Sequence, residues 1–146
     1  MKAVLGIALL ILAVAGLVFF AMQARQGLKA GGGAQLTGVH WQAVRIDDEA
    51  VPEDVDLQIQ FDVDGSIKGH SGCNRFFGSL QKSESGIEVS PLGSTRMACP
   101  EPVMNRETAF LDAVQKMKDF RIGDSEMSLL DEDGNVLASF VADPGR

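Results

Sequence analysis

The sequence predicts an α+β domain, in which one helix packs on a curved antiparallel sheet of about eight strands, behind an N-terminal transmembrane helix. Three observations lead to this fold class. Residues 57–63 alternate apolar and polar side chains, as a half-buried strand does. Asp-Gly pairs at 64–65 and 133–134 are preferred hairpin turns. Residues 103–117 carry apolar side chains at helical spacing.

The 146 residues divide into three parts. Residues 1–24 include an uncharged apolar run at 3–22, which at about 1.5 Å per residue spans a bilayer as a helix. We predict an uncleaved signal-anchor, because a signal peptide usually has a shorter apolar region and a small-residue cleavage site; a cleaved signal peptide is the alternative. Residues 25–35 contain three consecutive glycines and form a flexible tether. Residues 36–146 form the globular domain.

Charge and cysteine content predict where the domain resides. All 20 acidic residues lie after residue 31, together with only ten of the 13 basic residues. Such a domain is a poor ligand for nucleic acid or anionic lipid, because both bind through Lys and Arg. Two cysteines without metal-ligand spacing suit an oxidising compartment. We therefore predict a single-pass protein of the bacterial inner membrane, held by its N-terminal helix and facing the periplasm, or released there if cleaved.

The expected strands alternate with short turns. They are placed at 39–46, 57–63, 66–70, 76–82, 87–92, 95–99, 120–122, 127–130 and 136–140. The helix begins near Pro100 and Pro102, which a first helical turn tolerates, and ends near Lys116 and Lys118, which suit the negative end of its dipole. Trp41 is expected in the core. The apolar face of the helix comprises Val103, Phe110, Leu111, Val114 and Met117.

Residues 69–78 interrupt regular structure with three glycines and an asparagine. Because Gly and Asn tolerate positive φ, we expect Gly72 and Asn74 to bracket a tight bend. The same stretch contains Cys73, and Cys99 precedes the helix. We predict a disulfide between them, which would close a loop of about 25 residues. Free buried thiols are one alternative.

A nucleophilic thiol is the other alternative for Cys73, with His70 as its base. A metal role is not predicted, since His40 and His70 lie at no zinc-ligand spacing. The acidic clusters at 47–49 and 131–133 lack the spacing of a calcium loop and occupy turns. We therefore predict no catalytic, metal or cofactor residues.

An ordered series of short motifs runs between Leu36 and Phe140. In chain order the motifs are Trp41, Phe61 before Asp64-Gly65, Gly69-x-x-Gly72-Cys73-Asn74-Arg75-Phe76-x-Gly78, Thr95-x-Met97-Ala98-Cys99, Glu107 with Phe110-Leu111, and Leu129-x-Asp131. The series resembles the META domain family, typified by the heat-shock protein HslJ. The resemblance implies a compact α+β domain of bacterial envelope or secreted proteins, often linked to stress tolerance, and it assigns no biochemical activity. Relatives near HslJ are often lipoproteins, whereas this chain has a plain apolar anchor.

The motif residues also define a candidate surface site. Its members are Gly72, Asn74, Arg75, Phe76, Gly78, Thr95 and Met97. An arginine presented beside two phenylalanines is suited to bind an anion or a partner carboxylate. In the alternative interpretation, Asn74 fixes the bend and Arg75 pairs with an acidic neighbour.

These observations favour a non-enzymatic envelope module for stress tolerance or binding, whose partner is an envelope protein or a small ligand. One alternative is an accessory protein, similar to a pilot or chaperone in secretion or envelope assembly. It would hold a hydrophobic segment in an open apolar groove between helix and sheet. The other alternative is a thiol-dependent enzyme that uses Cys73 and His70.

Overall fold

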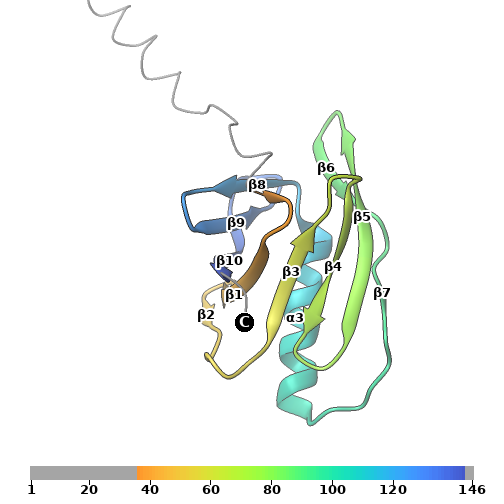
Figure 1. Ribbon diagram of the computed structural model, residues 1–146, viewed down its shortest axis with the longest axis vertical. Coiled ribbons are helices and arrows are strands. Elements are labelled where there is room, and N and C mark those ends of the chain that lie inside the picture. Colours follow the sequence, from red (N-terminus) through yellow and green to blue (C-terminus); the bar gives the residue numbers. More distant parts are fainter. Residues whose placement is uncertain (1–35, 144–146) are drawn as a thin grey trace, which may run out of the picture. The chain divides into compact units, whose positions relative to one another are not determined.

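The computed structural model describes residues 36–143, which form one sheet and one helix, α3 (Glu101–Lys116) (Figure 1). The predicted anchor, residues 1–24, and the predicted tether, residues 25–35, lie outside the described residues. Within residues 36–143, no helix is long and apolar enough to cross a membrane. The ten strands are β1 (His40–Ile46), β2 (Glu49–Ala50), β3 (Leu57–Phe61), β4 (Ser66–Ser71), β5 (Arg75–Ser83), β6 (Gly86–Val89), β7 (Gly93–Ser94), β8 (Asp119–Ile122), β9 (Glu126–Leu130) and β10 (Val136–Asp143).

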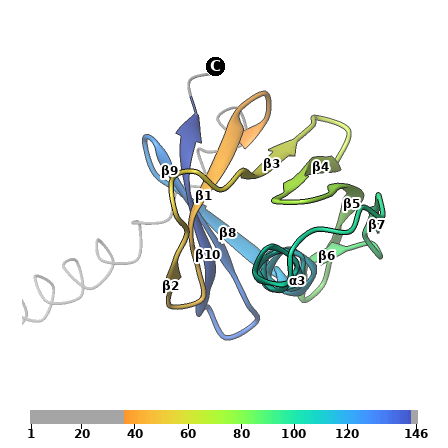
Figure 2. The same ribbon diagram turned by 90° about the horizontal axis from the view of Figure 1, so that it is seen from below.

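The sheet is antiparallel throughout and has the strand order β6-β5-β4-β3-β1-β10-β9-β8, with β2 added to β1 and β7 to β5. Its two ends approach each other, because the backbone N–H of Ile87 donates to the carbonyl of Lys118 at 2.7 Å. Figure 2 shows the strands curving around, with α3 between the β8 and β6 ends. The predicted α+β class is confirmed. The sheet has ten strands and not about eight, because it also includes β2 and β7, two strands of two residues each that the sequence did not predict.

Both Asp-Gly turns are confirmed. Gly65 and Gly134 have φ values of +84° and +81°, a left-handed conformation that glycine adopts without steric cost. In the first turn, the carboxylate of Asp64 accepts a hydrogen bond from the backbone N–H of Ser66 at 2.9 Å. These local interactions fix the register of the β3–β4 and β9–β10 hairpins.

One predicted strand, residues 95–99, is wrong. Regular pairing ends with β7, whose two residues lie opposite Phe76 and Phe77 of β5. Beyond β7 the backbone N–H of Met97 donates to the side chain of Asn74 at 2.7 Å instead of to a neighbouring strand. The side-chain oxygen of Asn74 thus takes the place of a backbone acceptor on a neighbouring strand, and the segment is irregular.

The core lies between α3 and the inner face of the sheet. The rings of Phe76 and Phe110 meet edge to face at 5.7 Å between centroids. Trp41 is buried as predicted, and its indole N–H donates to the carbonyl of Leu36 at 3.2 Å. The predicted apolar helix face is fully buried at Phe110, Val114 and Met117, while Val103 and Leu111 are half-buried.

That burial fills the space between helix and sheet. Phe110, Val114 and Met117 have no exposed surface, and all three belong to one continuous core cluster. An open apolar groove therefore does not run along this face of α3.

Candidate functional site

The disulfide prediction is confirmed. Cys73 and Cys99 are bonded, with their Cα atoms 6.1 Å apart, so the bend after β4 is tied to the segment just before α3. His70 lies on β4 with its Nδ1 atom 2.9 Å from the backbone oxygen of Asp56. Because both cysteines of the chain are bonded, the alternative thiol mechanism lacks its nucleophile.

Asn74 is a buried anchor and not a surface residue. Its side chain is 4% exposed, and its Oδ1 atom accepts hydrogen bonds from the backbone N–H of Met97 at 2.7 Å and the hydroxyl of Thr95 at 2.8 Å. Its Nδ2 atom donates to the carboxylate of Glu107 at 3.0 Å. The expected positive φ occurs at Gly72 (+91°) but not at Asn74. Asn74 holds the bend through its side chain, so the expected backbone role at this position is wrong.

Glu107 completes a buried polar network that motif reasoning did not assign. It is 5% exposed, on the inner side of α3, and its carboxylate accepts hydrogen bonds from the Ser71 hydroxyl and the Asn74 amide. The sequence did carry a signal for this position. Glu107 lies four residues after Val103 and three before Phe110, which is the spacing of the apolar helix face.

The network joins four segments: the end of β4, the bend, the segment after β7, and α3. No buried side-chain nitrogen or oxygen in residues 36–143 lacks a hydrogen-bond partner. A fully satisfied buried network specifies one arrangement, because any other leaves a polar group unpaired in a low dielectric. We refer to Ser71, Asn74 and Glu107 as the anchoring network.

The structure separates the predicted surface site into buried and exposed residues. Phe76 lies in the core like Asn74, so the prediction of surface exposure is wrong for both. Gly78 packs closely, since a Cβ atom there would lie 2.7 Å from the side chain of Leu92. Arg75 and Met97 are exposed, as is Thr95 at the same edge.

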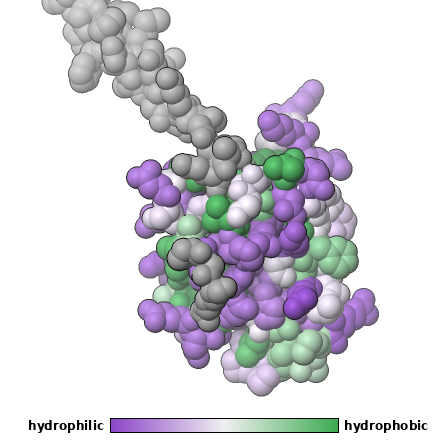
Figure 3. Space-filling model, viewed as in Figure 1, coloured by the Kyte–Doolittle hydropathy of each residue, from purple (hydrophilic) through white to green (hydrophobic). Residues whose placement is uncertain are grey.

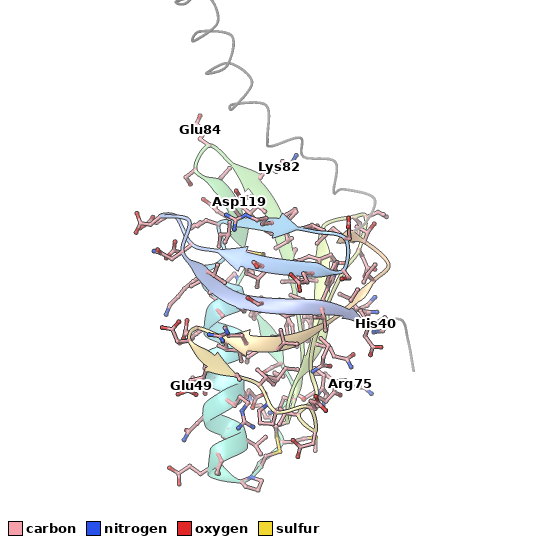
Figure 4. All side chains as sticks on the ribbon, turned by 90° about the vertical axis from the view of Figure 1, so that its left-hand side faces the viewer. His40, Glu49, Arg75, Lys82, Glu84 and Asp119 are labelled. Carbon is pink, nitrogen blue, oxygen red and sulfur yellow. A yellow bond between two sulfur atoms is a disulfide. The ribbon has the colours of Figure 1, made fainter. Side chains whose placement is uncertain are left out.

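Arg75 belongs to a larger set of side chains, on the side of the sheet opposite the core. In one cross-strand row, Gln42 of β1 pairs with Gln58 of β3, then His70 of β4, then Arg75 of β5. Side chains of directly paired residues point to the same face. Figure 4 shows His40 and Arg75 on the same side of the sheet, away from α3.

A second row runs parallel to the first. Gln60 of β3 pairs with Lys68 of β4 and then Phe77 of β5, and the amide of Gln60 donates to the ring of His40 on β1. We call both rows together the outer face. Its members are His40, Gln42, Gln58, Gln60, Lys68, His70, Arg75 and Phe77.

The outer face is rich in nitrogen donors and has no carboxylate among its eight members. Figure 3 shows that this side of the molecule is largely hydrophilic. Lys68 pairs with Asp62 at 2.7 Å, and His70 lies 3.5 Å from the carboxylate of Asp56. Within residues 36–143 the guanidinium of Arg75 has no ion-pair partner, so the alternative interpretation, in which Arg75 pairs with an acidic neighbour, finds no support. Phe77 is 63% exposed.

A cavity of about 380 Å³ adjoins the β1 end of the outer face. Its floor includes His40, Gln42 and Gln58, and the loop before β3 forms its rim. The Gln42 amide donates to the carbonyl of Val55 at 3.0 Å and holds this loop against the sheet. The carboxylates that line the cavity are those of Glu53, Asp54 and Asp56 in this loop and of Asp143 at the end of β10. The described residues contain no cluster of His, Cys, Asp or Glu suited to hold a metal.

The acidic turn at 131–133 has a backbone role. The carboxylate of Asp131 accepts hydrogen bonds from the backbone N–H groups of Asp133 at 3.0 Å and Asn135 at 2.8 Å, and from the Asn135 amide at 3.0 Å. These bonds to the charged form lower the pKa of Asp131, the side-chain bond from Asn135 contributing most. The cluster thus stabilises the β9–β10 turn.

Comparison with known proteins supports the same fold. A solution structure of a protein from Burkholderia xenovorans is 24% identical over 80% of this chain and 90% of its own, with a TM-score of 0.62. A crystal structure of a DUF4847 family protein from Bacteroides vulgatus is 13% identical over 80% of this chain and all of its own, with a TM-score of 0.57. No protein with a curated description matches significantly.

The sequence profile of the META domain matches residues 34–144. That span includes β1 to β10, α3, the disulfide and the anchoring network. The resemblance found in the sequence is therefore confirmed. The chain belongs to the META domain family.

Proposed function

We propose that this chain is a non-enzymatic binding module of the bacterial envelope that recognises its partner through the outer face. The observation that carries the proposal is the pair Arg75 and Phe77 on β5. The arginine lacks an ion-pair partner within residues 36–143, and the phenylalanine keeps most of its surface in solvent. Arginine and aromatic side chains are enriched at the centres of binding interfaces.

The framework behind these residues supports a binding role. Arg75 follows Asn74 directly, so the anchoring network and the disulfide restrain the start of β5. The Phe77 ring lies over Gly93 of β7, where a Cβ atom would come within 2.4 Å of it. Side chains that are held in place before a partner binds lose less conformational entropy on association.

Location is part of the proposal. Residues 1–24 would anchor the chain in the inner membrane and residues 25–35 would let the domain reach into the periplasm. The uncharged apolar run supports the anchor, and the disulfide suits an oxidising compartment. A role in stress tolerance rests on the family resemblance alone.

The alternative of an accessory protein for a hydrophobic segment finds less support. It required an open apolar groove between helix and sheet, and Phe110, Val114 and Met117 fill that space. The outer face offers only one large apolar side chain, Phe77. A hydrophobic segment would gain little burial there.

The test places a photo-crosslinking amino acid, p-benzoylphenylalanine, at position 77 of the full-length chain in living cells. Position 63 is the control, because Val63 is also apolar and is 92% exposed, in the turn after β3. We expect a crosslinked product of increased mass from position 77 and none from position 63. Absence of a product at 77, or the same product at both positions, would overturn the proposal.

A further inference from the structure

We propose that the partner of the outer face is an acidic glycan, a polysaccharide whose sugar rings carry carboxylates. The inference rests on the proposed function and names the chemistry that the face fits. Three properties of the face carry it: the kind of donors, the position of the unpaired cation, and the cavity at the opposite end.

The donors are the first property. Seven of the eight side chains carry nitrogen, and three of them, Gln42, Gln58 and Gln60, carry planar amides. The Gln42 and Gln60 amides each donate one hydrogen bond inside the protein, to Val55 and His40. A planar amide has two N–H groups and an acceptor oxygen, so each one still matches a pair of neighbouring hydroxyl groups on a sugar ring. The groups are spread over an extended sheet surface and not gathered in a deep apolar pocket. A surface of this kind suits a ligand with many hydroxyl groups.

The cationic end is the second property. Arg75 provides a guanidinium whose fork geometry binds a carboxylate through two parallel hydrogen bonds. Within residues 36–143 no carboxylate pairs with this guanidinium, since Asp62 pairs with Lys68 and Asp56 lies beside His70. Phe77, two residues along the same strand, offers a flat apolar surface on which the C–H face of a sugar ring can lie.

The cavity at the β1 end is the third property. The carboxylates of Glu53, Asp54 and Asp56 and the oxygens of the Gln42 and Gln58 amides can accept hydrogen bonds from hydroxyl groups. Three strand spacings, roughly 14 Å, separate β1 from β5 across the face. A glycan lying across the strands therefore places hydroxyl groups over the cavity and a carboxylate at Arg75.

Other classes of partner fit less well. A peptide interface needs a buried apolar centre, and Phe77 is the single large apolar side chain on the face. A nucleic acid or an anionic lipid surface needs several cations, whereas residues 36–143 contain 20 acidic and nine basic side chains. A carboxylated sugar chain also presents hydroxyl groups on every ring, which the amides of the face can bind alongside the one unpaired guanidinium.

The test measures binding of the full-length protein, in non-ionic detergent, to three soluble polymers by isothermal titration calorimetry. Alginate supplies sugar rings with carboxylates, dextran supplies sugar rings without them, and polyglutamate supplies carboxylates without sugar. We expect binding to alginate, and at least tenfold weaker binding to the other two. Equal binding to polyglutamate would show charge attraction alone, and equal binding to dextran would show that the carboxylate is not recognised; either result overturns the inference.

Two variants locate the site. Arg75→Ala removes the guanidinium on the face, and Arg121→Ala makes the same charge change at an exposed position on β8. We expect Arg75→Ala to weaken alginate binding by about tenfold or more, since a charged hydrogen-bonding pair is lost. Phe77→Ala should also weaken it, and Arg121→Ala should not. Equal losses for the two arginine variants would contradict the assigned site.

The crosslinking test separates this inference from the proposed function. A crosslinked product of one defined mass that contains a second protein would support the proposed binding function and contradict the glycan inference. A broad product that collapses on treatment with a polysaccharide lyase supports both. No product at position 77 ends both.

Discussion

The carboxylate of Glu107 on α3 accepts a hydrogen bond at 3.0 Å from the side-chain amide of Asn74, which lies 33 residues earlier in the bend after β4. Both side chains are buried, and each has further partners inside the protein. The contact connects the only helix of residues 36–143 to the segment that presents Arg75. It holds the glycine-containing bend against the core.

Glu107→Ala is expected to lower the free energy of unfolding by about 2–3 kcal/mol, because the Ser71 hydroxyl and the Asn74 amide lose their buried acceptor. Chemical denaturation measures the loss. Asp112→Ala, at an exposed position of the same helix, is the control and should change stability by no more than about 0.5 kcal/mol.

A double-mutant cycle with Asn74→Ala gives a sharper test of the same contact. Because the two residues share one hydrogen bond, the double variant should lose less stability than the sum of the single variants. Additive losses would mean that the two side chains stabilise the fold independently, contrary to the structure.

Breaking the disulfide is expected to lower the free energy of unfolding by about 3 kcal/mol, the loop-closure contribution for a loop of this length. Cys73 and Cys99 are separated by 26 positions, and the bridge links two segments that are also joined by hydrogen bonds of Asn74 and Arg75. The paired variant Cys73→Ser/Cys99→Ser should unfold at lower denaturant concentration than the oxidised wild type. Addition of reductant should destabilise the wild type and leave the paired variant unchanged.

Much of the fold could be predicted because its signals are local. The alternation at 57–63, the two Asp-Gly turns and the spacing of Phe110, Val114 and Met117 each lie within a few residues of sequence. The structure places β3, both hairpins and the buried helix face accordingly. The wrong strand at 95–99 illustrates the limit. In that segment the backbone of Met97 bonds to the side chain of Asn74, 23 residues away, and a contact at this separation leaves no local sequence pattern.

The candidate site was predicted only in part for the same reason. Arg75 was identified because it follows the conspicuous bend, but its neighbours on the outer face come from three other strands. Whether Gln58 and His70 lie beside it depends on register, which is set by the pairing of whole strands. Glu107 was named among the motif residues but given no role, because an acidic side chain on a helix is expected at the surface unless buried hydrogen-bond donors are known.

Asn135→Ala is expected to raise the pKa of Asp131 toward its usual value of 3.8, because the largest cause of the lowered pKa is the Asn135 side chain. A carboxyl whose pKa is lowered by folding stabilises the folded protein at every pH above the pKa of the unfolded state. This stabilisation is lost as the pH falls through the pKa of the folded state. NMR titration of side-chain carboxyl carbons measures the shift. Asp64, whose pKa is lowered mainly by Ser66 in the other hairpin, is the internal control and should not change.

Gly69→Ala is expected to be among the most damaging single substitutions in the domain. A Cβ atom at Gly69 would lie 1.9 Å from the backbone oxygen of Gln58 and 2.7 Å from the ring of Phe76. Relief requires β4 to move away from β3, which would break the register that aligns the outer face. Overpacking of this kind costs about 1–3 kcal/mol, and more where backbone must shift.

Gly123→Ala is the matched control for Gly69→Ala. Its nearest contact would be an ordinary 3.8 Å from the backbone oxygen of Glu126, so we expect little change in stability. Thermal unfolding of both variants, followed by far-ultraviolet circular dichroism, compares them directly. A Gly69→Ala protein that unfolds at the wild-type temperature would mean that β3 and β4 do not approach as closely as the structure places them. The alignment of Gln58 with His70, on which the outer face depends, would then need to be determined again.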